Sequence, residues 1–327
     1  MSLFNTNMNP IKTNNYSSRQ PDNFFTSTPD VVQQDNHILQ TQVHKPLKKK
    51  YVNIDTKFQN SDTGYGSKLG EAVFNAVLPQ RITEVQALSI RCMEVPYSFY
   101  NFSQALQNTF FTFQYNNGNI ITVTIPDNNY TTPSSLITAV NTALIALDSN
   151  LTITISTNGN SAILRNNHVT GSVVFTFDTD SNGKYDKNNF KSKLGWALGF
   201  RNIKYTIAPT KTQTSESFIN INTVKYLYLA IQENPNQGNP NSFVCPLFQS
   251  YINKDIVARI AIDTHFFPFG TVIDANYNNG YLLSDKRTYH PGKLALQNLQ
   301  LQLLTDNGTP VNLNGQDFSF IMELEHY

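Results

Sequence analysis

Alternation of apolar and polar residues with a period of two constrains the fold of this chain more than any other feature of its sequence. In the segment 111–125, two alternating runs flank the turn sequence Asn116-Asn117-Gly118, a pattern typical of a β-hairpin. Another alternating run, 151–155, precedes the turn pair Asn158-Gly159, whose residues tolerate positive φ. Further strands are predicted over 173–177, 224–231 and 256–262. Strands of this kind bury one face against a second layer.

The leucines near residue 300 predict an irregularity in the pairing of their strand. Leu294 and Leu296 lie in one phase of the alternation, whereas the next three lie in the other: Leu299, Leu301 and Leu303. All five face one core only if an extra residue shifts the register, so a β-bulge is expected near Gln297-Asn298. The terminal strand then places four apolar side chains on one buried face: Phe318, Phe320, Met322 and Leu324.

Helices are few in this sequence. Thr132 as N-cap and Pro133 at the first helical position, followed by apolar residues at helical spacing, predict a helix over 132–147. A shorter helix is expected over 191–198. Many short strands, short turns and two inserted helices predict that residues 51–327 form an all-β domain, one antiparallel β-sandwich of the jelly-roll type.

Charged residues are scarce and balanced. Only 14% of positions are charged, and 24 Lys and Arg against 23 Asp and Glu give a net charge of +1. This balance argues against a general nucleic-acid-binding surface, so no specific nucleic acid partner is expected. Cys92 and Cys245 have no CxxC partner and are expected to be free thiols, which indicates synthesis in a reducing cytoplasm.

Residues 1–50 differ from the rest and are expected to form an extended N-terminal arm. They carry scattered polar residues and too few apolar ones to bury a core. The arm ends in a basic cluster that we interpret as an interaction arm: Lys45, Lys48, Lys49 and Lys50. Two explanations stay open, namely a solvated charge run, or contact with an anionic membrane, nucleic acid or an acidic neighbouring subunit.

Sequence motifs of catalysis and of cofactor binding are absent. We find no Walker loop, no GxSxG, no HExxH and no GxGxxG after a strand, so neither catalytic residues nor cofactors are expected. The six histidines are dispersed, and Asp263 with His265 does not complete a metal coordination sphere.

The segment 178–186 is the sharpest candidate for a cation site. Four of its residues are spaced like the oxygen ligands of a calcium loop: Asp178, Asp180, Asn182 and Asp186. Gly183 permits the sharp bend, but the twelfth position is Asn189 where a bidentate Glu is usual, and a strand precedes the loop instead of a helix. A solvated hairpin loop explains the same residues without an ion, and both interpretations stay open.

Five segments resemble the single jelly-roll minor capsid and penton proteins of the nucleocytoplasmic large DNA viruses. Residues 51–58 resemble the start of that domain, and 78–82 with 88–100 resemble its first long strand. The third segment, 125–131, is similar to the family's IPxGNYT pattern before a helix, with Asp127-Asn128 where a Gly-containing turn is more usual. The last two resemble the family's LGW-LGFR element and its closing hairpin: 194–201, and 303–308 with 312–320.

The resemblance implies a structural virion protein without enzyme activity. It favours a penton-type protein that forms a homopentamer at the vertex of an icosahedral shell, although a minor capsid protein at another position has the same pattern. The implied partners are other copies of the chain, the major capsid protein and other minor capsid proteins, and for the basic arm an internal membrane or acidic neighbours. The implied location is the capsid shell of the virion, after assembly in the host cytoplasm. Few charges also fit a surface that other subunits cover.

Two other functional classes are open at this point. The alternative function is a jelly-roll glycan-binding module for host attachment, which needs a shallow groove with exposed aromatic side chains beside Asn or Asp. The third class is an enzyme on a β-sandwich, for which the sequence places no acid and base together.

Overall fold

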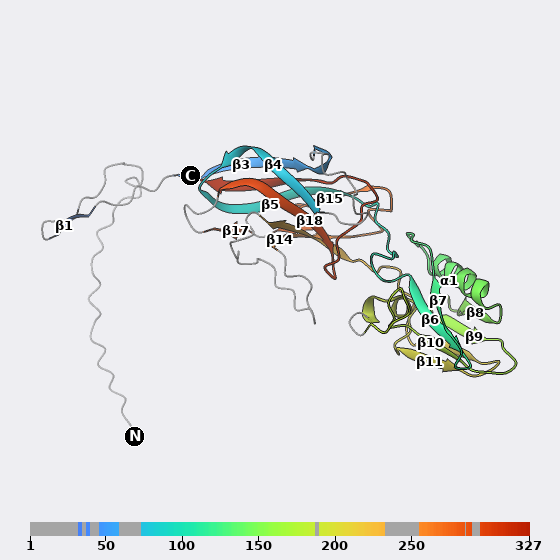
Figure 1. Cartoon of the computed structure of the whole chain (residues 1–327). Helices are drawn as coiled ribbons and strands as arrows, with labels where there is room; N and C mark the ends of the chain where they lie inside the picture. The colour runs from blue at the N-terminus through green and yellow to red at the C-terminus, as the bar shows by residue number, and fades with distance from the viewer. Residues whose placement is uncertain are drawn as a thin grey trace, which may run out of the picture. The chain divides into compact units, whose positions relative to one another are not determined.

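The computed structural model describes residues 32–34, 37–39, 46–58, 73–186, 190–232, 255–284, 286–289 and 295–327 (Figure 1). The chain divides into two compact units, Met1–Pro46 and Leu47–Tyr327. In the first unit, β1 (Val32–Gln34) and β2 (His37–Leu39) pair as an antiparallel hairpin. The rest of the predicted arm before residue 46, including Lys45, lies outside the described residues.

Four strands that are far apart in the sequence form the first sheet of the second unit. They are β3 (Lys48–Asp55), β5 (Val85–Pro96), β15 (Val272–Asn276) and β19 (Ser319–His326). Their order is β15-β5-β19-β3, all neighbours are antiparallel, and the short β17 (Arg287–Thr288) also pairs with β5. The C-terminal strand therefore lies between two strands from the first hundred residues.

The second sheet has five strands. They are β4 (Val73–Ile82), β13 (Tyr226–Gln232), β14 (Ile256–Ala261), β16 (Leu282–Ser284) and β18 (Leu296–Thr305). Their order is β16-β14-β13-β18-β4, again with antiparallel neighbours.

The pairing of the eight main strands identifies the fold. Taken in chain order, these strands are β3, β4, β5, β13, β14, β15, β18 and β19. The first pairs with the eighth, the second with the seventh, the third with the sixth and the fourth with the fifth. This nested antiparallel pairing across two sheets is that of a jelly roll, which confirms the predicted fold class.

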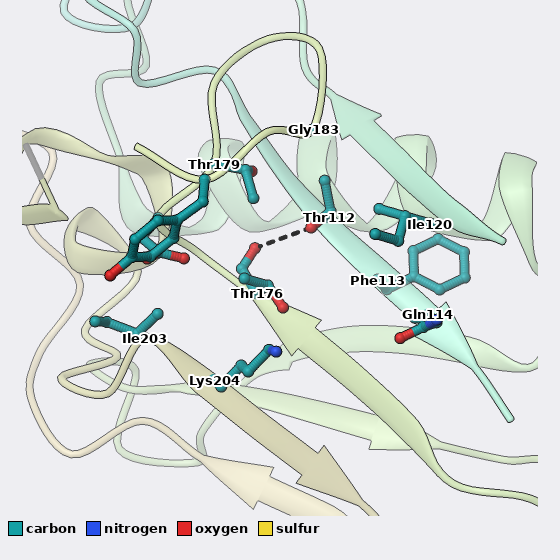
Figure 2. Close-up of a pocket in the computed structure, with 11 residues that line it drawn as sticks. Thr112, Phe113, Gln114, Ile120, Thr176, Thr179, Gly183, Ile203 and Lys204 are labelled. Atoms are coloured by element: carbon teal, nitrogen blue, oxygen red, sulfur yellow. Dashed lines mark hydrogen bonds between the residues drawn. The ribbon is translucent and has the colours of Figure 1, made fainter. Parts of the chain in front are cut away.

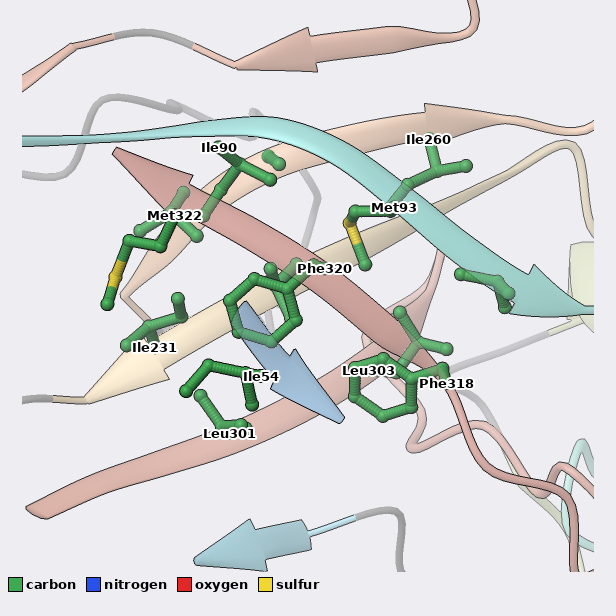
Figure 3. Close-up of a cluster of buried hydrophobic side chains, with 14 of the residues drawn as sticks. Ile54, Ile90, Met93, Ile231, Ile260, Leu301, Leu303, Phe318, Phe320 and Met322 are labelled. Carbon is green, nitrogen blue, oxygen red and sulfur yellow. The ribbon is translucent and has the colours of Figure 1, made fainter. Parts of the chain in front are cut away.

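Apolar side chains from both sheets fill the space between them (Figure 3). Ile54, Ile90 and Phe320 from the first sheet meet Ile231, Leu301 and Leu303 from the second, and all six are at most 7% exposed. Phe318 packs edge-on against Phe74 of β4, with ring centroids 5.2 Å apart. This core is the main source of the jelly roll's stability, because burying one such side chain is worth roughly 1.5–3 kcal/mol.

The predicted bulge in β18 is confirmed. The register of β18 against β4 shifts between Leu296 and Asn298. Leu296, Leu299, Leu301 and Leu303 are all at most 2% exposed, so the extra residue brings both phases of the alternation into one core. Leu294 lies outside the described residues.

The chain between β5 and β13 forms an insertion with a hydrophobic core of its own. One of its sheets has the order β11-β10-β6-β7, from β6 (Phe110–Tyr115), β7 (Ile120–Thr124), β10 (Val173–Thr176) and β11 (Lys204–Ile207). The other has the order β12-β9-β8, from β8 (Leu151–Ile155), β9 (Ala162–Asn166) and β12 (Thr212–Thr214). The sequence pattern does not distinguish these strands from those of the jelly roll. Alternation indicates that a residue is buried, but it does not indicate which strand or sheet covers that residue.

The first predicted helix is confirmed. It is α1 (Pro133–Leu147), in which Thr132 and Ser135 form a reciprocal capping box. The second predicted helix is broken into a 3-10 turn, Phe190–Ser192, and the single-turn α2 (Leu194–Ala197); another 3-10 turn, Thr56–Phe58, follows β3. Within the described part of the chain, none of the helices has the length and apolar character needed to cross a membrane.

Asn101 joins the two chain segments that connect the jelly roll with the insertion. Its Nδ2 donates hydrogen bonds to the carbonyls of Tyr130 (2.8 Å) and Ile221 (3.0 Å), and its Oδ1 accepts one from the Tyr130 amide (2.9 Å). The Thr223 hydroxyl donates to the Asn101 carbonyl. One buried amide side chain thus links the segment that enters the insertion to the segment that leaves it.

Gly199 allows a close approach between two backbone segments of the insertion. Its φ is +95°, and a Cβ at this position would collide with the main-chain carbonyl oxygen of Ser217. Phe200, the next residue, is fully buried and stacks on Phe177 with ring centroids 5.0 Å apart. The glycine before Phe200-Arg201 therefore has a steric reason to be there.

We expect Gly199→Ala to lower the free energy of unfolding by about 2–5 kcal/mol, because left-handed strain adds to a steric collision. Gly159→Ala is the matched control, since Gly159 has a φ of +73° and a Cβ added there would meet no other atom within 4 Å. The control substitution is expected to lower the free energy of unfolding by about 1–2 kcal/mol, from backbone strain alone. Urea unfolding of both variants measures the difference, and equal losses would contradict the steric explanation.

Candidate functional site

The predicted calcium loop is a hairpin between β10 and the 3-10 turn Phe190–Ser192. Thr179 and Tyr185 form an antiparallel bridge, and the Asp186 amide donates to the Asp178 carbonyl at 2.6 Å. Gly183 has a φ of +76° at the tip. The local sequence forms this turn because Gly and Asx residues tolerate such backbone angles.

The carboxylates of this loop have separate surroundings. Asp180 Oδ1 accepts hydrogen bonds from the amides of Asn182 (2.9 Å) and Lys184 (2.8 Å), which is a turn-stabilising role. Asp186 forms a 2.7 Å ion pair with Lys193, whose side chain is fully buried. Asp178 is only 1% exposed. Among the residues that the structure describes, no three His, Cys, Asp or Glu side chains gather as metal ligands would, and Asn189 lies outside them. Calcium binding at this loop stays a prediction.

Three of the four predicted arm lysines belong to the jelly roll. Lys48, Lys49 and Lys50 are the first residues of β3 and pair with 324–326 of β19. The expected arm boundary at residue 50 therefore lies inside this strand. Lys48 and Lys49 are exposed, whereas Lys50 is half-buried. Contact of these lysines with a partner stays a prediction.

Lys49 contributes to an ion-pair cluster on the outer face of the first sheet. Its Nζ lies 3.0 Å from Glu323 Oε1, and Arg91 Nη2 lies 2.6 Å from Glu323 Oε2. Glu323 is buried beneath these cations, with 3% of its side chain exposed. The hydrogen bond from Arg91, followed by that from Lys49, lowers the pKa of Glu323 from 4.5 to about 2 despite its burial. The cluster joins β3, β19 and β5.

We expect Glu323→Gln to lower the free energy of unfolding at pH 7 by about 1–3 kcal/mol, because it leaves two cations beside a neutral amide. The folded-state pKa of Glu323 is depressed, so its contribution is present above pH 4.5 and is lost as the pH falls toward 2. The difference between wild type and variant should therefore shrink over this window in urea unfolding.

The control for this prediction is Glu325→Gln, since Glu325 pairs at 2.6 Å with Lys286, which is 52% exposed. An exposed partner of this kind contributes at most about 1 kcal/mol. A Glu323→Gln loss that is no larger than the control, or that does not change with pH, would contradict the account of the cluster.

The strand orders of the two described sheets end in β3 and β15 and in β4 and β16, and these edge strands differ in how well they are protected against pairing with another chain. β3 begins with three lysines, β4 contains Pro79 and Arg81, and β16 has only three residues. Lysine, proline and shortness all discourage edge-to-edge pairing. β15 has five residues with none of these features and a single charge, Asp274. It is the least protected edge of the described sandwich.

Large apolar side chains are exposed next to β15 in the sequence. Phe266 and Tyr277 are 66% and 76% exposed, Phe269 is 42% exposed and Val272 is 54% exposed. Phe266 stacks on Tyr281, with ring centroids 5.9 Å apart, and Phe269 stacks on Tyr100 at 6.2 Å. We call β15 together with Phe266, Phe269 and Tyr277 the β15 edge surface. Exposed aromatic groups beside an open edge are typical of a surface that another protein covers.

The loop before β15 is held by Asp263. Its Oδ1 accepts hydrogen bonds from the amides of His265 (3.0 Å) and Phe266 (3.3 Å), and its Oδ2 accepts one from the Tyr281 hydroxyl (3.3 Å). Sequence reasoning considered Asp263 and His265 as metal ligands and missed Phe266, Phe269 and Tyr277. The run Phe266-Phe267-Pro268-Phe269-Gly270 was the available signal, because three aromatic residues are unusual in a turn.

Two tyrosines of β13, Tyr226 and Tyr228, lie on the outer face of the second sheet, opposite the core residues Leu227 and Leu229. Tyr228 is 7% exposed and packs with Ala230, Ile256 and Leu304. Tyr226 is half-buried, and the Arg259 guanidinium lies 4.2 Å from the centre of its ring. Tyr228 therefore has a packing role.

Comparisons with known proteins give structural neighbours only. No protein-family model matches the sequence, and no curated protein matches it. A crystal structure of the mavirus penton protein covers 86% of this chain and 99% of that chain, at 10% sequence identity and a TM-score of 0.43. A cryo-EM structure of the Sputnik virophage covers 86% of this chain and 98% of that chain, at 15% identity and a TM-score of 0.40.

Proposed function

We propose that this chain is a structural virion protein, a penton-type or other minor capsid protein whose jelly roll packs against neighbouring subunits in an icosahedral shell. The observation that carries the proposal is the nested pairing of eight strands in two sheets, a fold of viral capsid domains that lectins and cupins also use. Such a domain performs its role as a rigid block and needs no chemical step. In this role the chain is not an enzyme, and its place is the capsid shell.

The family motifs of the sequence support the proposal by where they lie. Residues 51–58 and 78–82 belong to β3, its 3-10 turn and β4, and 88–100 belongs to β5 and the segment after it. The closing hairpin, 303–320, includes the end of β18 and the start of β19. These three segments contribute to the first, second, third, seventh and eighth strands of the jelly roll, whereas the other two, 125–131 and 194–201, lie in the insertion.

A vertex ring of five copies is the favoured assembly. A cyclic ring uses one repeated contact between two different surfaces of the subunit. The β15 edge surface supplies one of them: an unprotected strand edge with exposed aromatic side chains, which are enriched at the centres of interfaces. The occupant we propose is a second copy of this chain, because closure of the ring covers the same edge on every subunit.

The remaining partners follow from this assembly. The N-terminal arm is proposed to lie across a neighbouring subunit or, through its lysines, against an internal membrane, which adds interface area outside the sandwich. Outside the ring, the chain is proposed to contact the major capsid protein and other minor capsid proteins after synthesis in the host cytoplasm.

Multi-angle light scattering of the purified full chain over about 1–100 µM tests the assembly. We expect a concentration-dependent shift from 36.9 kDa subunits to a closed oligomer, with five copies favoured. A chain that stays monomeric at every concentration would count against the ring. Specific hits on a glycan array would instead favour the glycan-binding alternative.

The double variant Phe266→Ser/Tyr277→Ser tests the β15 edge surface. We expect it to raise the concentration needed for assembly by ~10-fold or more, because aromatic side chains dominate interface energies. Phe218→Ser is the matched control, since Phe218 is 68% exposed but lies in the insertion. Equal assembly of wild type and double variant would exclude this surface as the ring contact.

A further inference from the structure

The insertion contains a pocket that none of the proposed assembly contacts uses (Figure 2). It lies beside the β6–β10 strand pair, under the hairpin loop that carries Gly183, and has a volume of about 290 Å³. Thr112 of β6 and Thr176 of β10 lie next to each other in its wall, where the Thr112 hydroxyl donates to the Thr176 carbonyl at 3.5 Å. Ile120 and Ile203 also line it and are 61% and 41% exposed, so the pocket opens at the surface.

Asp178 is the unusual group of this pocket. It lines the pocket and is only 1% exposed, yet neither of its carboxylate oxygens has a hydrogen-bond partner. The neighbouring Thr179, 4% exposed, also lines the pocket with a hydroxyl that has no partner. Burial raises the pKa of Asp178, and its own backbone amide and the positive charges of Lys204 and Lys193 offset only part of this effect. Buried polar groups are nearly always paired, so this pair requires an explanation.

The other walls of the pocket indicate what kind of group would pair with Asp178. Phe113, Ile120 and Ile203 provide apolar contacts, and Tyr185, which is 61% exposed, provides an aromatic ring. A carboxylate, aliphatic walls and an aromatic ring together suit an organic cation on an aliphatic stem. The volume is at the lower end of the range for small-molecule sites, roughly 300–1,000 Å³, so the occupant is a single side chain or a molecule of that size.

A metal ion fits these residues less well. Asp178 is the only carboxylate that lines the described pocket. Of the other two aspartates in the loop, Asp186 is paired with Lys193, and the Oδ1 of Asp180 accepts hydrogen bonds within the turn. Calcium takes about six to eight oxygen ligands, usually with several carboxylates. One buried carboxylate matches the single positive charge of an ammonium or a guanidinium group.

We infer that this pocket binds a guanidinium or primary ammonium group on an aliphatic stem, with Asp178 as its anionic partner. Two sources share this chemistry: an Arg or Lys side chain of a neighbouring protein, and a free alkyl amine or alkyl guanidine. Lys204 also lines the pocket, and its exposed positive charge opposes the cation. Removing the negative charge of Asp178 is therefore expected to weaken binding of the cation, whereas removing the positive charge of Lys204 is expected to strengthen it.

Isothermal titration calorimetry on the full chain tests the inference with four probes. The free cation is N-butylguanidine, the side-chain cation is the blocked peptide acetyl-Gly-Arg-Gly-amide, the neutral shape control is N-butylurea, and the metal is calcium chloride. We expect butylguanidine to bind and N-butylurea not to bind. Binding of the peptide as well identifies a protein side chain as a fitting source, and binding of butylguanidine alone identifies a free cation.

Three variants assign the binding to Asp178. Asp178→Asn should weaken butylguanidine binding by ~10-fold or more, because a charged hydrogen bond is lost. Asp180→Asn is the matched control in the same loop, outside the pocket lining, and should bind like wild type. Lys204→Gln, at an exposed position of β11, should tighten binding by about threefold.

The unfolding temperature gives a second readout without any probe. We expect Asp178→Asn to unfold at the same or a higher temperature than wild type, since it removes an unpartnered buried charge. A lower unfolding temperature would indicate that Asp178 has a structural role. The inference is overturned if no cation binds at millimolar concentration, if N-butylurea binds equally, if Lys204→Gln does not tighten binding, or if calcium alone binds and Asp178→Asn abolishes that binding.

Discussion

The structure depends on one constraint, the burial of the inner faces of two sheets against each other. The strand β19 lies between β3 and β5 and pairs with both, so it joins the two parts of the first sheet. Phe318, Phe320 and Met322, which β19 and the residue before it supply, are at most 1% exposed. The closing contact joins the first and the last strand of the jelly roll, which are more than 260 residues apart at Thr56 and Asp317. Non-local pairing of this kind makes folding slow relative to helical domains.

The insertion is placed where it does not disturb this pairing. It connects the third and fourth of the eight strands, and its own core is satisfied without the jelly roll. Asn101 ties its entering and leaving segments together, so the insertion behaves as a unit joined at one point. The two proposed binding surfaces therefore lie in different parts of the chain. The exposed strand edge belongs to the sandwich, and the pocket with the buried Asp178 belongs to the insertion.

Much of the fold was predictable because local patterns report burial. The change of phase among Leu296, Leu299 and Leu303 predicted the bulge, and the Thr132-Pro133 pair predicted the start of α1. Pairing partners were not predictable in the same way. A run of lysines in sequence resembles a solvated arm, but Lys49 meets Glu323 only through the β3–β19 pairing. In the same way, the loop at 178–186 has calcium-like spacing, and only the fold shows that Lys193 pairs with Asp186 while Asp178 is buried without a partner.

Electron microscopy of the purified full chain, at a concentration where it assembles, tests the central claim most directly. The account predicts a closed ring with five-fold symmetry, in which the β15 edge surface of each copy is covered by the next copy and the nested strand pairing of each subunit is intact. Separate single copies, or a ring whose contacts leave β15, Phe266 and Tyr277 open to solvent, would contradict it.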